Sequence, residues 1–188
     1  MEEEIPYLLL GRFTPDGVVV EDEKAIEELK LRGYGDEEPA GLRLKDYEAI
    51  FLVYNERMKI TEDGKEVTAQ GLVDFALSRD ADAWTRFLIY RDLRSRGYVV
   101  REGFGFGVDF RVYDRGEYGS KSAKYVVWGL NEGTKTTVDE LGRMVGQMMK
   151  MGKEAVLAVI ERRGEVIYYK IGRWRANVRL AVKAKSLG

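Results

Sequence analysis

The residue types that the chain lacks narrow the chemistry it can carry out. Its 188 residues include no histidine and no cysteine. Without cysteine there are no disulfides, iron–sulfur ligands, thiol nucleophiles or cysteine-bearing zinc sites. Without histidine there is no imidazole, the side chain most often used as a general acid or base near neutral pH. Carboxylate, lysine, tyrosine and hydroxyl groups remain as candidates for catalysis.

A glycine-rich stretch at residues 103–107 is the one segment that suggests a phosphate-binding loop. Gly103, Gly105 and Gly107 alternate with other residues in REGFGFGVDF. Neither GxGxxG nor GKS/T is present, and these glycines precede an expected strand rather than open a helix. We therefore expect a turn or a β-bulge here.

The charge of the chain is unevenly distributed. The formal net charge is −1, but residues 1–88 hold 11 Lys and Arg against 21 Asp and Glu, whereas residues 89–188 hold 20 against 11. Residues 173–188 contain Arg173, Arg175, Arg179 and two lysines without one acid. A basic half is suited to contact a polyanion such as RNA. The alternative is a solvated tail beside a solubilising acidic half.

Hydrophobic spacing predicts an α+β protein of two parts. With 45% hydrophobic and 34% charged residues, the chain can bury a core. Residues 1–82 are expected to form a small α+β module, with strands at 7–13 and 17–20, a strand and turn at 58–66, and helices at 21–32, 44–54 and 70–77. Residues 83–188 are expected to form a mixed-sheet domain flanked by helices, with helices at 83–96 and 138–153 and strands at 98–101, 108–113, 124–130, 155–160 and 166–171.

The second of these C-terminal helices has an apolar face that predicts burial. The face consists of Leu141, Met144, Val145, Met148 and Met149. Elsewhere no apolar run approaches the roughly 20 residues that cross a bilayer, and the start, MEEEIPYLLL, lacks the basic region of a signal peptide. We therefore expect a cytoplasmic protein without a membrane contact. Its abundance of charged residues suits a heat-adapted protein.

Several stretches together resemble one family. YRDLRSRGYVVREGFGFGVDFRVY, SAKYVV and EAVLAVIERRGEVIYYKI are similar to the carboxyl-terminal domain of the archaeal tRNA-splicing endonucleases, and LKDYEAIFLVYNERMKI is similar to their amino-terminal module. The resemblance implies removal of introns from precursor tRNA at bulge–helix–bulge sites, leaving 2′,3′-cyclic phosphate and 5′-hydroxyl ends. It implies no metal or cofactor, because the attacking 2′-hydroxyl belongs to the RNA.

The family's catalytic tyrosine, histidine and lysine can be assigned to positions of this chain. The tyrosine of the Asp-Phe-x-x-Tyr strand corresponds to Tyr113, and the lysine before Val-Leu-Ala-Val corresponds to Lys153. The histidine position is occupied by Ser122. A serine hydroxyl has a pKa far above neutral and cannot protonate the leaving oxygen as an imidazole would. Lys121 is adjacent and can orient phosphate, although an ordinary lysine is a weak proton donor.

The resemblance is also incomplete at the position that grips a bulged base. The family usually has an arginine two helical turns before the catalytic lysine, and this chain has Gly146 there, with Arg143 one turn earlier. Tyr113 and Lys153 also have ordinary structural roles open to them, as a packed strand residue and as a helix cap.

These departures imply a chain that works through a partner. The resemblance suggests the structural subunit of a heterotetrameric endonuclease, with two copies beside two catalytic chains. Its subunit contacts would be Glu161 and Glu165 of a hairpin loop and Tyr168 and Tyr169 of the following strand, unless this is an ordinary surface hairpin. Precursor tRNA would contact Lys121, Arg143, Arg173, Arg175 and Arg179. The alternatives are a histidine-less catalytic lyase and an RNA-binding module without a cleavage partner.

Overall fold

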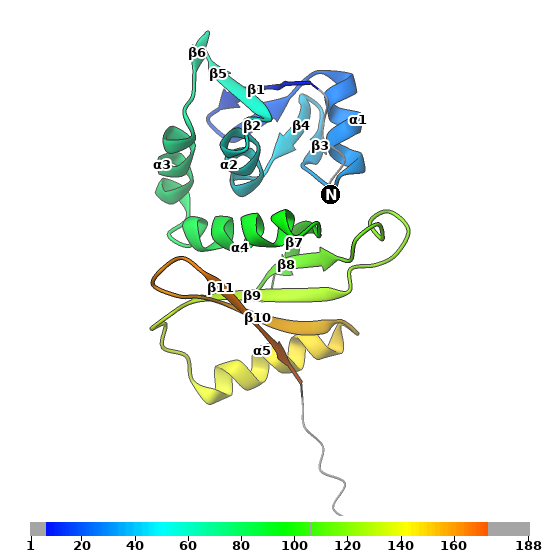
Figure 1. Cartoon of the computed structure of the whole chain (residues 1–188), viewed down its shortest axis with the longest axis vertical. Coiled ribbons are helices and arrows are strands. Elements are labelled where there is room, and N and C mark those ends of the chain that lie inside the picture. The colour runs from blue at the N-terminus through cyan, green and yellow to red at the C-terminus, as the bar shows by residue number, and fades with distance from the viewer. Residues whose placement is uncertain (1–6, 106, 173–188) are drawn as a thin grey trace, which may run out of the picture.

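The computed structural model describes residues 7–105 and 107–172. Two sheets with their helices are stacked along the long axis of the molecule (Figure 1). The predicted α+β class is confirmed. The predicted RNA contacts Arg173, Arg175 and Arg179 lie outside the described residues.

The amino-terminal sheet has the strand order β3-β4-β2-β1-β5-β6. Strands β1 and β5 pair in parallel and the other neighbours are antiparallel. The elements of this half are β1 (Leu9–Thr14), β2 (Gly17–Val20), α1 (Glu23–Leu31), β3 (Asp36–Glu38), β4 (Gly41–Leu44), α2 (Asp46–Tyr54), β5 (Met58–Glu62), β6 (Lys65–Glu66) and α3 (Ala69–Arg79).

The β3–β4 hairpin is absent from the sequence-based prediction. Strand β3 is the exposed acidic run Asp36–Glu38, which has no hydrophobic alternation to indicate a strand. The hairpin depends on Gly41, whose φ is +132°. A Cβ at this position would lie 2.2 Å from the carbonyl oxygen of Val20, so only glycine allows β4 to pair this closely with β2.

The carboxyl-terminal sheet has the strand order β11-β10-β9-β8-β7 and is mixed, as predicted. Only β9 and β10 pair in parallel, and α5 lies between them in the chain. Helix α4 covers one face of the sheet and α5 covers the other (Figure 1). The elements are α4 (Ala83–Ser95), β7 (Val99–Gly105), β8 (Val108–Tyr113), β9 (Tyr125–Asn131), α5 (Val138–Lys150), β10 (Glu154–Ile160) and β11 (Val166–Ile171).

Helix α5 begins and ends on local signals. The hydroxyl of Thr137 accepts a hydrogen bond from the Glu140 N–H, and the Glu140 carboxylate accepts one from the Thr137 N–H. The helix ends at Lys150, before the predicted residue 153, and Gly152 follows with φ +65°. Val145 and Met148 are buried, but Met149 is 41% exposed, so its assignment to the inner face is wrong.

The hydrophobic core runs without interruption across residue 82. Helix α2 of the first sheet packs on α4 of the second, and the rings of Tyr47 and Tyr90 lie 4.8 Å apart between their centroids. Tyr47 also packs edge-on against Phe110 of β8, at 5.2 Å. The amino-terminal half is therefore fixed against the sheet that carries the candidate catalytic residues.

A buried carboxylate lies in the same contact region. Glu48 is 1% exposed, and its carboxylate accepts hydrogen bonds from the N–H groups of Gly35 at 3.0 Å and Lys45 at 2.9 Å. Nη1 of Arg101 on β7 lies 3.8 Å from its other oxygen. Burial dominates over these contacts and raises the pKa of Glu48 to about 7.

This raised pKa predicts that stability falls as pH rises through the range from about 4.5 to 7. A carboxyl group whose pKa is higher in the folded protein than its unfolded value of about 4.3 binds more protons when folded. Stability therefore declines with pH across that window, by up to about 3 kcal/mol. Urea unfolding at a series of pH values measures this. Glu48→Gln should flatten the dependence, and an increase in stability over the same window would contradict the assignment.

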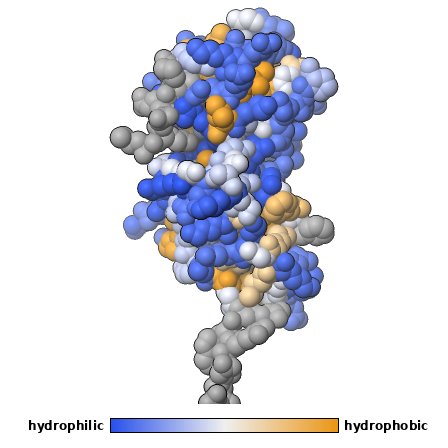
Figure 2. Space-filling view, turned by 90° about the vertical axis from the view of Figure 1, so that its right-hand side faces the viewer, coloured by the Kyte–Doolittle hydropathy of each residue, from blue (hydrophilic) through white to orange (hydrophobic). Residues whose placement is uncertain are grey.

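The face shown in Figure 2 is mostly hydrophilic, with separate hydrophobic groups over both halves. Within the part of the chain that the structure describes, no helix has the length and apolar character needed to cross a membrane.

Candidate functional site

The candidate catalytic positions meet where three strands of the second sheet lie side by side. The Lys124 N–H donates to the Val112 carbonyl at 2.9 Å, and the Glu154 N–H donates to the Lys124 carbonyl at 3.0 Å. These bonds align the end of β8 with the starts of β9 and β10. Tyr113 is the last residue of β8, and Lys153 immediately precedes β10.

Ser122 and Lys153 are in direct contact. Nζ of Lys153 donates a hydrogen bond to Oγ of Ser122 at 2.7 Å. Ser122 is exposed and Lys153 is half-buried. The resemblance predicted that these positions belong to one site, and this pair has the geometry to bind a phosphate oxygen with one ammonium and one hydroxyl group.

Tyr113 is positioned by a residue that sequence analysis missed. Its ring packs edge-on against Tyr118, at 5.0 Å between centroids. Tyr118 in turn packs on Gly33, where a Cβ would lie 3.1 Å from the Tyr118 ring. Among the described residues, no hydrogen bond involves the Tyr113 hydroxyl. Tyr118 lies in a loop without periodicity, so no pattern indicated this contact.

Lysines near the site form ion pairs with carboxylates of the preceding loop. Lys121, a predicted RNA contact, pairs with Glu117 at 2.5 Å and its side chain is 66% exposed. Lys124 pairs with Asp114 at 2.8 Å, and this hydrogen bond raises the pKa of Lys124 above its ordinary value. The Lys124 ammonium therefore stays charged near neutral pH and is a poor proton donor. Arg143 lies exposed on α5.

The predicted subunit-contact residues differ in their surroundings. The loop that joins β10 and β11 is closed by a bond from the Glu161 N–H to the Glu165 carbonyl at 2.9 Å. The Tyr168 hydroxyl donates a hydrogen bond to the Asp92 carboxylate of α4 at 2.8 Å, so this side chain links β11 to a helix of the same chain. Tyr169 follows on the opposite face of β11 and is 51% exposed. Strand β11 is an edge strand of the sheet.

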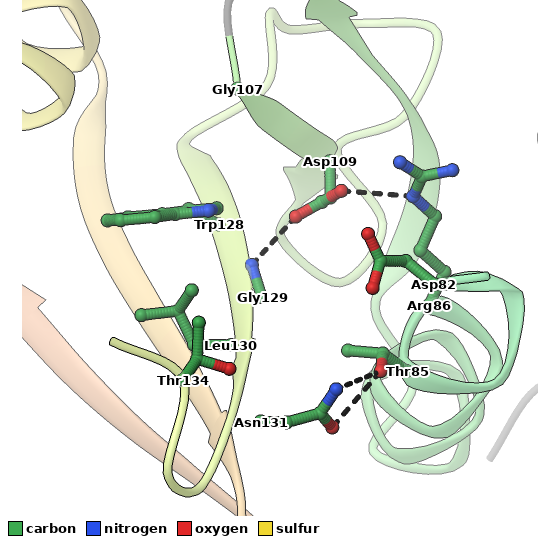
Figure 3. A pocket seen from close by; sticks show the side chains of 10 residues that line it. All are labelled: Asp82, Thr85, Arg86, Gly107, Asp109, Trp128, Gly129, Leu130, Asn131 and Thr134. Atoms are coloured by element: carbon green, nitrogen blue, oxygen red, sulfur yellow. Dashed lines mark hydrogen bonds and ion pairs between the residues drawn. The ribbon is translucent and has the colours of Figure 1, made fainter. Parts of the chain in front are cut away.

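A pocket of about 260 Å³ lies at the other ends of β8 and β9, away from Ser122 and Lys153 (Figure 3). At its wall, Asp109 accepts hydrogen bonds from the Gly129 N–H at 2.7 Å and from Nε of Arg86 at 3.0 Å. These bonds connect β8, β9 and α4, which is a structural role for the carboxylate.

A second concavity, of about 330 Å³, lies between the two halves of the molecule. Its lining includes four cations and four carboxylates: Arg43, Lys45, Arg79, Arg86, Asp16, Asp46, Asp80 and Glu102. Several of them pair with each other, including Lys45 with Glu102 at 2.7 Å and Arg86 with Asp80. The groove is therefore balanced in charge rather than basic.

The chemistry available at the candidate site follows from its groups. The Ser122–Lys153 pair supplies a cation and a hydroxyl, and the neighbouring tyrosine supplies a phenol. A hydroxyl is too weak an acid to protonate a leaving alkoxide, and no imidazole exists in the chain. Within residues 7–105 and 107–172, no cluster of three or more acidic side chains is arranged to hold a metal ion.

Comparison with known proteins gives a consistent result. Residues 9–73 match the family described as tRNA intron endonuclease, N-terminal domain, and residues 83–168 match tRNA intron endonuclease, catalytic C-terminal domain. A protein of Pyrococcus furiosus named tRNA-splicing endonuclease is 32% identical over 172 residues, which cover 91% of this chain and 97% of that protein. A protein of the same name from Thermococcus onnurineus is 33% identical, over 91% of this chain and 97% of that protein. Another, from Methanococcus vannielii, is 30% identical, over 86% of this chain and 92% of that protein.

Proposed function

The chain belongs to the tRNA intron endonuclease family and has a role in tRNA intron removal, and we propose that it is the structural, non-catalytic subunit of a heterotetrameric enzyme. Two copies would assemble in the cytoplasm with two catalytic chains. The catalytic chains would cut precursor tRNA at bulge–helix–bulge sites to give 2′,3′-cyclic phosphate and 5′-hydroxyl ends.

One observation carries the proposal. Where the resemblance expects the histidine that protonates the leaving oxygen, Ser122 accepts a hydrogen bond from Lys153. Loss of a general acid costs about 10²- to 10⁴-fold in rate. The chain keeps the lysine and the strands that position it, but it lacks the general acid. This combination favours a role in binding the RNA backbone over a role in cutting it.

The proposed RNA contacts are cationic. Lys121 is exposed next to Ser122 in the chain, and Arg143 is exposed on α5. The tail arginines Arg173, Arg175 and Arg179 extend the same positive charge along the sequence, without intervening acids. Each cation that neutralises a phosphate should contribute to affinity and to its dependence on salt.

Assembly would use the β10–β11 hairpin. Tyr169 is exposed on an edge strand, which favours pairing with another chain. Glu161 and Glu165 in the hairpin loop are flanked by Arg162 and Arg163, so a receiving groove of mixed charge suits this loop better than a purely basic groove. Tyr168 would support the hairpin from within the chain through its bond to Asp92.

A second function has one observation in its favour. Tyr113 at the end of β8 and Lys153 just before β10 lie on either side of the start of β9. A catalytic lyase would need both, with Lys121, Ser122 or water in place of the histidine. An RNA-binding module without any cleavage partner is the third candidate, and the basic carboxyl-terminal half is its support.

Reconstitution tests the proposal. The chain and a catalytic family member from the same source are co-expressed, and the mass of the complex is measured by light scattering. We expect equal amounts of the two chains in an assembly of four, with cleavage that requires both. Failure of the two chains to associate, with full cleavage by the catalytic family member alone, would contradict the structural-subunit role.

A further inference from the structure

A β-bulge in the edge strand β7 of the second sheet leaves the aromatic ring of Phe104 exposed. The register between β7 and β8 shifts between Glu102 and Gly105, so Phe104 lies in the irregular segment. A Cβ at Gly103 would lie 1.9 Å from the Val108 carbonyl oxygen, so glycine is required for this close approach. A bulge re-aims the side chain next to it. Phe104 is 51% exposed as a result of this geometry.

Arg111 on the neighbouring strand packs on this ring. Its Cζ lies 4.5 Å from the centroid of Phe104. Nε of Arg111 donates to the Glu102 carbonyl at 2.7 Å, which fixes the plane of the guanidinium group. The two terminal nitrogens are left to contact a ligand.

No carboxylate among the described residues neutralises the charge of Arg111. In the part that the structure describes, Arg111 forms no ion pair. By contrast, Arg86 pairs with Asp109, Arg96 with Asp92 and Arg101 with Asp36. An arginine fixed by a backbone carbonyl and a ring, with its charge unpaired, is suited to an anionic ligand.

Arg111 links this ring to the strand that carries Tyr113, although Phe104 itself lies near Val108, at the other end of the β7–β8 hairpin from Tyr113. Arg111 and Tyr113 are two residues apart on β8, so their side chains leave the same face of the strand, with Cα atoms roughly 6.6 Å apart. From Tyr113 to Val108 the strand spans roughly 16 Å. An RNA strand that runs along this face from a phosphate near Tyr113 and Lys153 would therefore bring a base a few nucleotides further on, not the adjacent base, to Phe104.

We propose that Phe104 and Arg111 form a platform on which an unpaired RNA base stacks. The base lies against the exposed part of the Phe104 ring, and the terminal nitrogens of Arg111 contact the phosphate of the same nucleotide. Aromatic rings and guanidinium planes bind bases that are free of a duplex, because a paired base is already stacked. The inference rests on the RNA-binding part of the proposed function and does not depend on which chain cuts the RNA.

Binding to two synthetic RNAs tests the platform. One RNA contains a bulge–helix–bulge with 2-aminopurine in a bulge, and the other is fully paired and of equal length. Fluorescence titration of the full chain, at constant salt, gives the affinity for each. Phe104→Leu is expected to bind the bulged RNA about 5- to 100-fold more weakly and the paired RNA equally well. Phe104→Trp should keep the affinity and the quenching of 2-aminopurine.

Two further variants sharpen the result. Tyr54→Leu removes an aromatic side chain of α2 that is 60% exposed, and it should bind both RNAs as the wild-type chain does. Arg111→Lys keeps the charge but loses the planar group, so it should weaken binding of the bulged RNA and leave the salt dependence unchanged.

Three outcomes would overturn the platform. One is equal binding of the bulged RNA by Phe104→Leu and the wild-type chain. Another is an equal loss for both RNAs, which would indicate a general defect. The third is unchanged RNA binding with weaker association to a catalytic chain, which would make Phe104 a protein contact. Cleavage by the isolated chain would contradict the structural-subunit role and leave the platform intact.

Discussion

Ser122→His is expected to give the isolated chain an RNA-cleaving activity that the wild-type chain lacks. The substitution puts an imidazole beside Lys153, whose Nζ lies 2.7 Å from the present hydroxyl. An imidazolium can donate the proton that the leaving oxygen needs, and this role contributes about 10²- to 10⁴-fold in rate. The neighbouring ammonium favours the neutral imidazole, so activity should rise as pH falls below about 6.5. Single-turnover cleavage of a bulge–helix–bulge RNA over a pH series measures it.

Two control variants define the origin of that activity. Ser122→Gln supplies a polar side chain that does not titrate, and it should stay inactive. Ser122→His combined with Lys153→Met should lose the activity gained, because the cation for the phosphate oxygens is removed. If Ser122→His binds the RNA and still does not cut it, the missing imidazole is not what makes the site inactive.

Arg94→Met is expected to destabilise the folded chain by about 2–4 kcal/mol. Arg94 on α4 is 1% exposed. Its Nε donates to the Tyr90 hydroxyl at 3.0 Å, and its Nη2 donates to the Arg32 carbonyl at 2.9 Å, after the end of α1. Methionine fills most of the volume but leaves both acceptors without this donor. Urea unfolding should show a lower midpoint with one shared transition.

An exposed arginine on the same helix provides the matched control. Arg96 pairs with Asp92 in an exposed i,i+4 ion pair, and Arg96→Met should cost no more than about 1 kcal/mol. Equal losses for the two variants would contradict a special role for Arg94 in joining the two halves.

Much of the fold was predictable because its periodic segments are unambiguous. The helix at Ala83–Ser95, the three strands after it, the capped helix from Val138 and the final hairpin occur in the predicted order. The turn or β-bulge expected at the alternating glycines is confirmed by the shift in register between β7 and β8 from Glu102 to Gly105. Turn chemistry and hydrophobic spacing are local properties, so a single sequence reveals them.

Features set by strand pairing and packing, rather than by hydrophobic spacing, were not predictable. Strand β3 is acidic and exposed, and only its pairing with β4 makes it a strand. The continuity of the core across residue 82 comes from packing of α2 on α4, so the domain boundary placed there stays a prediction.

The candidate site also has a part that was predicted from the sequence and a part that only the structure shows. The resemblance selected Ser122 and Lys153, and their contact at 2.7 Å follows from strand pairing that the sequence alone does not show. Tyr118 and the Phe104–Arg111 pair have no motif and emerge only from the geometry. The catalytic, RNA-binding and subunit-contact roles of all these residues stay predictions, including those of Tyr113, Ser122 and Lys153.

The most direct measurement is an RNA-cleavage assay with the purified chain alone. A radiolabelled bulge–helix–bulge RNA is incubated with excess chain, and its ends are analysed for 2′,3′-cyclic phosphate. We expect the RNA to be bound and to remain intact over a period in which the reconstituted complex cuts it completely. Accurate cuts at both splice sites by the chain alone would contradict the account.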